Sequence, residues 1–364
     1  MKKKIFVFEL VLFFVLLFSC KKDSEEKLNP NQDNDIEHHY PVIQIDSISN
    51  ILLHTAEIHG TFINGGGDSI LRIGYCVGLN SGIEIGETNL MLSDTIDFNH
   101  KLSNLEAGKQ YFVKGFAYNS FDTSYTNEIS FILWDGKLTD FDGNEYKGVQ
   151  IGNQAWMAEN LRTTHYKDGT PVFKEPYWYG TGYRPSYWDG DLDGDGDGDS
   201  EDSTIYVEKY GQLYTWTSAN NLYFDGYNDL GGTPITLMAN DVCPDGWHLP
   251  SQNEFEELVS FVRSEHSYSE VAHMLKSKEG WFENNNGSDF YGFNLKPGGG
   301  WEDPNGSGLS YKAYLWSSTE GNSVNAIGYR IYYEYNNLDD IFVGKESHAF
   351  AVRCVKDLET VIAP

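Results

Sequence analysis

One stretch of the chain concentrates side chains that can ligate a metal ion. Eight carboxylates fall within fourteen residues, and no Lys or Arg lies among them. Left alone, these charges repel one another, but the glycines between them let the backbone turn tightly enough for the carboxylates to converge. A hard divalent cation such as Ca²⁺, which takes roughly six to eight oxygen ligands, suits this arrangement. The eight residues are Asp189, Asp191, Asp193, Asp195, Asp197, Asp199, Glu201 and Asp202.

Counted from Asp191, this stretch resembles an EF-hand or dockerin-type calcium loop, with Gly196 sixth and Asp202 twelfth. The short Asp at the last position weakens bidentate ligation, a count from Asp193 also fits, and no amphipathic pattern predicts a flanking helix. We therefore expect weak Ca²⁺ binding, on the order of 10⁻⁴ to 10⁻³ M, with a solvated acidic insertion as the alternative. The resemblance implies side-chain ligands at Asp191, Asp193, Asp195 and Asp202, a carbonyl ligand at Asp197, and a direct or water-mediated ligand at Asp199.

Aromatic residues crowd the segment just before the acidic stretch. Sugar rings stack on such side chains, so the segment is a candidate carbohydrate-binding platform. The alternative, that the rings fill a small core, is slightly favoured by the composition. The six rings belong to Tyr177, Trp178, Tyr179, Tyr183, Tyr187 and Trp188.

Catalytic patterns are missing from the sequence. No H-x-x-x-H or C-x-x-C spacing indicates zinc. His248 has no Ser or Cys nucleophile motif beside it, and we expect a hydrogen-bonded core histidine there. No spacing singles out a carboxylate pair for glycoside cleavage. These observations predict a protein that is not an enzyme; a carbohydrate-active enzyme with unidentified carboxylates is the alternative.

Length and charge bound the class of protein. The 364 residues carry 26 Lys and Arg against 54 Asp and Glu, a formal charge of −28. Nucleic acid is therefore excluded as a partner, because its binding begins with cations that neutralise phosphates. A hydrophobic content of 40% and an aromatic content of 15% exclude a disordered chain. The length suggests about two domains.

The first twenty residues predict the compartment. Three lysines precede an apolar run, Ile5 to Phe18, which is too short to span a bilayer but suits a signal peptide. The run ends in Leu17-Phe18-Ser19-Cys20, which resembles the lipobox of bacterial lipoproteins, with Cys20 as the acylated residue. We expect a signal peptide over 1–19, a tether over 20–39, a lipid anchor in the membrane, and exposure at the surface of the outer membrane.

All nine tryptophans lie at or after Trp134, which marks a domain boundary. Before it, short alternating runs predict an antiparallel sandwich over 40–133. Tyr111, after a Gly-bearing turn, resembles the tyrosine corner of immunoglobulin-like and fibronectin type III domains. Cys76 has no partner in this part, so we expect a buried free thiol.

The remaining half resembles the bacterial FISUMP family over 138–357. The resemblance implies an α+β domain with long loops, related to C-type lectin-like and sulfatase-modifying-factor folds, so that the whole chain is mainly β plus α+β. It suggests a lectin-like head that binds a glycan or a surface protein. Within it, a hairpin turns at Gly152-Asn153 and a capping box at Ser251 and Glu254 opens a helix. The segments that carry the resemblance are Ala158–Thr164, Tyr210–Trp216, Cys243–Ser251, Gly292–Gly299, Leu315–Glu320 and Ala351–Val355.

Long loops of this kind need a crosslink. Cys243 and Cys354 can form a disulfide in an oxidising compartment, whereas two free thiols or a metal pair are the alternative. A disulfide also leaves no thiol in this half of the chain for the oxidation chemistry of sulfatase-modifying enzymes.

Overall fold

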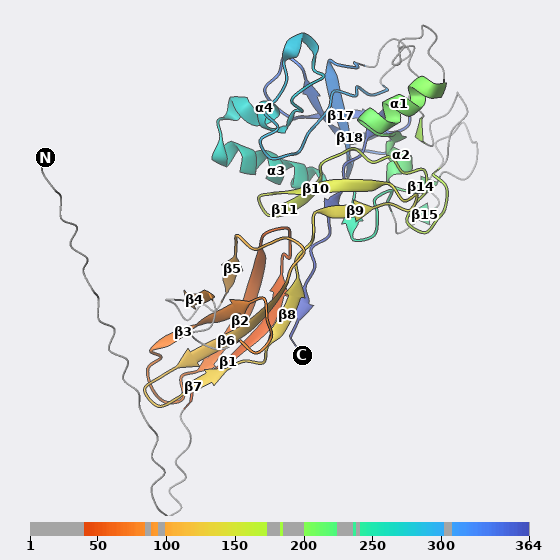
Figure 1. Cartoon of the computed structure of the whole chain (residues 1–364). Coiled ribbons are helices and arrows are strands. Elements are labelled where there is room, and N and C mark those ends of the chain that lie inside the picture. Colours follow the sequence, from red (N-terminus) through yellow and green to blue (C-terminus); the bar gives the residue numbers. More distant parts are fainter. Residues whose placement is uncertain are drawn as a thin grey trace, which may run out of the picture. The chain divides into compact units, whose positions relative to one another are not determined.

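The structure is a computed structural model that describes residues 40–83, 89–93, 99–172, 183–184, 200–223, 236–237, 241–301 and 308–363. Within these ranges, no helix is both long enough and apolar enough to span a bilayer. The mainly β character expected from the sequence is confirmed: strands far outnumber helices (Figure 1).

The first part of the chain forms two antiparallel sheets. One has the strand order β22-β1-β2-β5, and the other has the order β4-β3-β6-β7, with β8 also paired to β6. Both sheets contribute to a single hydrophobic core, in which Ile48, Ile58 and Val113 are fully buried. The strands are β1 (Val42–Ser49), β2 (Ala56–Asn64), β3 (Arg72–Gly78), β4 (Asn89–Ser93), β5 (His100–Leu102), β6 (Gln110–Tyr118), β7 (Thr123–Tyr125) and β8 (Ile129–Ile132), together with β22 (Val361–Ile362) from the far end of the chain.

Two details predicted from the sequence are present in this sandwich. The backbone N–H of Glu106 donates to the phenol oxygen of Tyr111 at 2.9 Å, which is the hydrogen bond of a tyrosine corner. Cys76 is buried on β3 and makes no disulfide.

The second part combines short sheets with a few helices (Figure 1). A five-stranded sheet has the order β16-β21-β11-β10-β9, a six-stranded sheet the order β12-β13-β20-β17-β18-β19, and β14 pairs with β15. The strands are β9 (Lys137–Thr139), β10 (Glu145–Ile151), β11 (Gln154–Met157), β12 (Tyr183–Arg184), β13 (Leu213–Thr215), β14 (Leu222–Tyr223), β15 (Thr236–Leu237), β16 (Trp247–His248), β17 (Lys312–Glu320), β18 (Asn325–Tyr332), β19 (Asp339–Gly344), β20 (Ala349–Ala351) and β21 (Val355–Lys356). The helices are α1 (Ser200–Tyr210), α2 (Trp216–Ala219), α3 (Gln252–Glu265) and α4 (Val271–Leu275), with short 3₁₀ turns η1 (Tyr268–Glu270) and η2 (Phe282–Asn284).

Local sequence signals fix several of these elements. Ile151 pairs with Gln154, so Gly152 and Asn153 form the two-residue turn of the β10–β11 hairpin, as predicted. At the start of α3, Ser251 and Glu254 form the expected capping box, each accepting from the other's backbone N–H. The apolar stripe of α3 is buried through Phe255, Leu258, Val259 and Val262.

The predicted disulfide joins Cys243 to Cys354. It crosslinks residues 111 positions apart, and both cysteines are fully buried in a core that includes Trp316 and Phe350. The crosslink therefore ties the loop before β16 to the last strands of the second part.

The end of the chain returns to the first sandwich, which the sequence did not predict. Val361 and Ile362 form β22, which pairs with Ile48 and Ser47 of β1. The backbone N–H of Ala363 also donates to the carbonyl of Asp46. The first sandwich is thus completed by residues from both ends of the described chain.

Candidate functional site

Most of the acidic stretch lies outside the described residues. Five of the predicted ligands are therefore not described: Asp191, Asp193, Asp195, Asp197 and Asp199. Its last member, Asp202, lies on α1, which begins at Ser200, the tenth position when the loop is counted from Asp191. No clear amphipathic helix was expected beside the stretch, and α1 is a helix without a strong amphipathic pattern. The helix is hard to detect because its apolar positions are few and weakly periodic. Among the described residues, no cluster of His, Cys, Asp and Glu is placed to hold a metal ion.

The predicted lipidation site and most of the predicted aromatic run also lie outside the described ranges. The lipidation site is Cys20. Of the aromatic run, only Tyr183 falls on a described strand, β12, and the structure does not describe Tyr177, Trp178, Tyr179, Tyr187 or Trp188.

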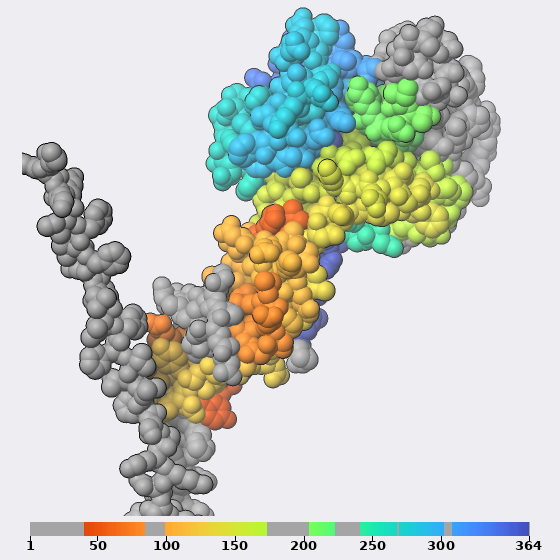
Figure 2. Space-filling model, in the orientation of Figure 1, coloured from red at the N-terminus to blue at the C-terminus, as the bar shows by residue number. Residues whose placement is uncertain are grey.

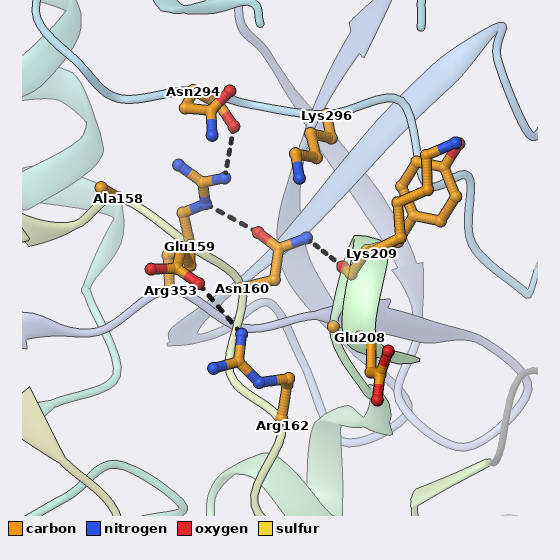
Figure 3. A pocket seen from close by; sticks show the side chains of 11 residues that line it. Ala158, Glu159, Asn160, Arg162, Glu208, Lys209, Asn294, Lys296 and Arg353 are labelled. Carbon is orange, nitrogen blue, oxygen red and sulfur yellow. Dashed lines mark hydrogen bonds and ion pairs between the residues drawn. The ribbon is translucent and has the colours of Figure 1, made fainter. Parts of the chain in front are cut away.

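A polar pocket in the second part brings together segments that are far apart in sequence. The pocket is small, with an interior of about 20 Å³, and much of its wall is charged. Figure 2 shows the surface of α1 (green) adjoining the segment around β10 and β11 (yellow-green) and the later chain (blue). Figure 3 shows the side chains that face the pocket. They belong to Ala158, Glu159, Asn160, Arg162, Glu208, Lys209, Tyr210, Asn294, Lys296 and Arg353, and the backbone of Gly211 completes the wall.

Backbone hydrogen bonds hold the floor of this pocket in place. The N–H of Leu161 donates to the carbonyl of Val352 at 2.9 Å, and the N–H of Gln212 donates to the carbonyl of Leu161 at 2.8 Å. Gly211 has a φ of +86°, and a Cβ on it would lie 2.4 Å from the Cβ of Asn160. Only glycine allows α1 to end this close to Asn160.

Arg353 and Asn160 form the centre of the pocket floor (Figure 3). The Nε of Arg353 donates to Oδ1 of Asn160 at 2.7 Å, and Nδ2 of Asn160 donates to the carbonyl of Tyr210 at 2.6 Å. The other guanidinium nitrogens donate to the carbonyls of Phe293 and Asn294. Burial lowers the pKa of Arg353 to about 9, so the side chain stays charged at neutral pH.

The neighbouring charges are unevenly balanced. Arg162 forms an ion pair with Glu159 at 3.0 Å. Lys209 and Lys296 also line the pocket, and within the described ranges neither forms an ion pair. Nζ of Lys209 lies 5.2 Å from the ring centroid of Tyr210. The wall therefore carries four cationic and two acidic side chains, in a chain whose formal charge is −28.

The sequence patterns did not identify this pocket as a site, although the family resemblance includes its segments. Asn160, Tyr210, Asn294 and Arg353 lie in four different segments that carry that resemblance. The available signal was an Arg within the apolar segment Ala351–Val355. An Arg flanked by apolar residues must find partners elsewhere in the fold.

His248 differs from the expectation of a core histidine. Its side chain is 36% exposed and lies between two carboxylates, with Nε2 2.6 Å from Glu254 and Nδ1 2.6 Å from Asp357. Hydrogen bonds to these carboxylates raise the pKa of His248 to about 9, which makes it a cation at neutral pH. Asp357 comes from a segment 109 residues away in sequence, so the neighbouring residues gave no sign of this ion pair.

A second feature is a group of partly exposed aromatic rings, here called the aromatic platform. Phe282 stacks on Tyr311 with ring centroids 4.3 Å apart, and Tyr333 lies edge-on to both rings. Tyr332 packs beside Tyr333 and Tyr335, and the exposed fractions of Tyr311 and Tyr335 are 37% and 50%. The platform consists of Phe282, Tyr311, Tyr332, Tyr333 and Tyr335.

Buried contacts fix the aromatic platform from beneath. The N–H of Phe282 donates to the carbonyl of Ser310 at 2.9 Å, and the N–H of Tyr333 donates to the carbonyl of Tyr311 at 2.7 Å. Nζ of Lys276 donates to the carbonyl of Tyr333 at 2.7 Å and lies 4.5 Å from the Trp281 ring centroid. Burial lowers the pKa of Lys276 to about 8. The rings are therefore held in a preorganised arrangement.

Strained backbone borders the platform. Glu283 and Asn284, directly after Phe282, have φ values of 52° and 57°. Two successive non-glycine residues in the left-handed region are unfavourable, and such strain is concentrated at functional sites. Their exposed polar side chains lie next to the rings in the sequence.

The comparisons with known proteins assign the second part to a family. The family model named Fibrobacter succinogenes major domain matches residues 149–356, more than half of the chain. No curated protein matches the chain.

Solved structures give weak similarities. The sensor domain of the anti-sigma factor RsgI4 in Pseudobacteroides cellulosolvens is 16% identical, with a TM-score of 0.21, over 26% of this chain and 94% of that chain. The fibronectin type-III domain of human fibronectin type III domain containing protein 3 is 17% identical, with a TM-score of 0.20, over 29% of this chain and 93% of that chain. Titin kinase with its flanking domains is 14% identical, with a TM-score of 0.19, over 26% of this chain and 17% of that chain.

Proposed function

The chain belongs to the Fibrobacter succinogenes major domain family, and we propose that it is a non-enzymatic binding protein that recognises carbohydrate. The observation that carries this proposal is the aromatic platform. Its most exposed rings, Tyr311 and Tyr335, leave aromatic surface open to solvent, and exposed polar residues lie beside Tyr335 in the sequence. Sugars present C–H faces and hydroxyl groups to such surfaces, so stacking and hydrogen bonding act together.

Binding rather than bond cleavage is supported by the chemistry of the second part. Its two cysteines are consumed by the Cys243–Cys354 disulfide, and the third described cysteine, Cys76, is buried in the sandwich. His248 is a poor candidate for a general base, because both of its ring nitrogens are occupied by carboxylates. We also propose that the second part of the chain is related in fold to C-type lectin-like and sulfatase-modifying-factor domains.

The proposal includes a lipid anchor and a calcium loop. We propose that Cys20 is acylated and holds the protein on the outer membrane, with the sandwich as a spacer below the binding domain. We also propose that Asp191 to Asp202 hold Ca²⁺ weakly. The start of α1 at Ser200 supports this idea, because it places Asp202 on the first turn of a helix. Calorimetry with millimolar Ca²⁺ tests it, and the absence of heat would refute a calcium site.

The test of carbohydrate binding is a glycan array followed by titration of the bound glycan. We compare the wild-type protein with Tyr311→Ala, Tyr335→Ala and a matched control, Tyr40→Ala. Tyr40 is 48% exposed and lies in the first part of the chain. Each platform variant is expected to weaken binding about five- to tenfold, because stacking on one aromatic ring contributes about 1–1.5 kcal/mol.

A hydrolysis assay on the same glycans separates binding from catalysis. Binding without turnover supports the proposal. Turnover that disappears on substitution of one Asp or Glu would instead establish the alternative, a carbohydrate-active enzyme. Equal affinities for wild-type, Tyr311→Ala and Tyr335→Ala would reject the platform as the contact surface.

A further inference from the structure

We propose that the pocket around Asn160 and Arg353 binds the carboxylate of an acidic sugar. This inference rests on the proposed carbohydrate-binding function and names the chemical class of the ligand. Pocket and platform belong to adjoining segments of the chain: Lys296 precedes Pro297, whose carbonyl accepts from the N–H of Ser310, next to Tyr311 of the platform.

The first argument is the sign of the local charge. A chain with a formal charge of −28 repels anions over most of its surface. At this pocket, however, Arg162, Lys209, Lys296 and Arg353 outnumber the acidic side chains by two. An anion that approaches this acidic protein therefore finds an attractive potential here.

The second argument is the incomplete neutralisation of Arg353. Its side chain is 1% exposed, and its guanidinium donates to Asn160, Phe293 and Asn294, all of which offer neutral acceptors. Among the described residues, no carboxylate forms an ion pair with it. Asp289 and Glu159 attract it only from a longer range. A buried cation without a carboxylate in direct contact is costly, and an anion in the pocket would add to this partial compensation.

The third argument is size. The interior of the pocket is only about 20 Å³, close to the room that one water molecule requires. It can admit the oxygen atoms of a carboxylate but not a sugar ring. The acidic group would therefore enter the pocket, with Lys296 and Lys209 as flexible donors at its rim, while the ring remains outside.

These contacts predict how binding depends on charge. Lys296 and Lys209 supply charge-assisted hydrogen bonds, whereas Arg353 supplies a fixed field from the floor. Neutral sugars have no carboxylate and therefore should not be attracted by these positive charges. Binding should also weaken as salt increases, because the lysine side chains are partly exposed and their attraction is screened.

The experiment is a titration of the full chain with sodium glucuronate, D-glucose and sodium sulfate, followed by saturation-transfer NMR. The proteins are wild type, Lys296→Gln, Lys209→Gln and a control, Lys109→Gln, which removes one positive charge from the exposed surface of the first part. Fluorescence melting curves verify that each variant is folded. Glucuronate is expected to bind the wild type and the Lys109→Gln control with similar affinity. Its affinity for Lys296→Gln should be about tenfold lower. Glucose should show no saturable binding to any of these proteins.

Three results would overturn the inference. They are no saturable binding of glucuronate to the wild type, equal glucuronate affinity in wild type and both pocket variants, and sulfate binding as tight as glucuronate. None of these decides the proposed function, which depends on the glycan array and on Tyr311→Ala. Conversely, glucuronate binding with a blank array would retain the acid-binding pocket and reject the platform.

Discussion

The side chain of Arg353 donates a hydrogen bond to Asn160, which lies 193 residues away in sequence. The side-chain amide of Asn160 in turn donates to the carbonyl of Tyr210, the last residue of α1. One small amide therefore joins the segment after β11, the end of α1 and the segment before β21. Removing it leaves the Nε–H of Arg353 and the carbonyl of Tyr210 buried without these partners.

We predict that Asn160→Ala lowers the free energy of unfolding by about 2–4 kcal/mol, since each orphaned buried group costs about 1–3 kcal/mol. Urea unfolding followed by tryptophan fluorescence measures this loss in the relevant part, because all nine tryptophans lie at or after Trp134. The control is Asn336→Ala, an exposed amide, which should change stability by less than about 0.5 kcal/mol. Equal effects of the two variants would contradict the bridging role of Asn160.

Gly211→Ala tests the close approach of α1 to the pocket floor. The new Cβ would lie 2.4 Å from the Cβ of Asn160, so we expect a loss of about 2–4 kcal/mol from overpacking and backbone strain. Gly246→Ala is the matched control: Gly246 has a φ of +75°, but a Cβ added there would have no neighbour within 4 Å. The control should lose only about 1–2 kcal/mol. If both variants melt at the same temperature, the steric argument is wrong.

The sequence predicted those features that depend on neighbouring residues. The Gly152-Asn153 turn, the Ser251–Glu254 capping box and the Tyr111 corner each join residues no more than five positions apart. The disulfide was also predictable, because Cys243 and Cys354 are the only two cysteines after Cys76. Each of these residues has few alternative partners in the sequence, so its contact could be predicted without the fold.

The pocket and the return of β22 could not be predicted in this way. Arg353 meets Asn160 only because the segment after β11, the end of α1 and the segment before β21 are folded beside one another, and no local pattern specifies that partner. Likewise His248 receives Asp357 from a distant segment. The sequence Tyr332-Tyr333-Glu334-Tyr335 did show clustered aromatics, but the stacking of Phe282 on Tyr311 required the fold.

The disulfide predicts a large loss of stability on its removal. Cys243 and Cys354 are 111 residues apart, and closing a loop of that length restricts the unfolded chain by about 4–5 kcal/mol. The double variant Cys243→Ala/Cys354→Ala should therefore unfold at clearly lower urea, with Cys76→Ala as a control for a cysteine outside the crosslink. A thiol assay on denatured, unreduced protein checks the pairing: reactive Cys243 or Cys354 would show that it is absent.

His248 makes stability depend on pH above neutrality. Its pKa is raised to about 9 in the folded protein from an unfolded value of 6.5. The charged form is thus favoured by folding, and its contribution is full below pH 6.5 and is lost as the pH rises through about 9. The melting temperature of His248→Gln should lie below that of the wild type at pH 6, and the gap should close by about pH 10. A gap that stays constant across this range would exclude this ion pair as the cause.

Lys276 should influence ligand binding more than stability. Burial lowers its pKa to about 8 from an unfolded value of 10.5, so the charged form is disfavoured by folding and wild-type stability should rise between those two pH values. Lys276→Met removes this burden but also a hydrogen bond, and because the two effects oppose one another the melting temperature at about pH 7 should change little, without the pH-dependent rise. It also releases the carbonyl of Tyr333, which Lys276 ties beneath the aromatic platform. Glycan affinity should therefore fall, whereas Lys278→Met, at an exposed position nearby, should leave both quantities unchanged. A Lys276→Met protein that is destabilised at neutral pH but binds glycan normally would show that Lys276 supports the core and does not position the platform.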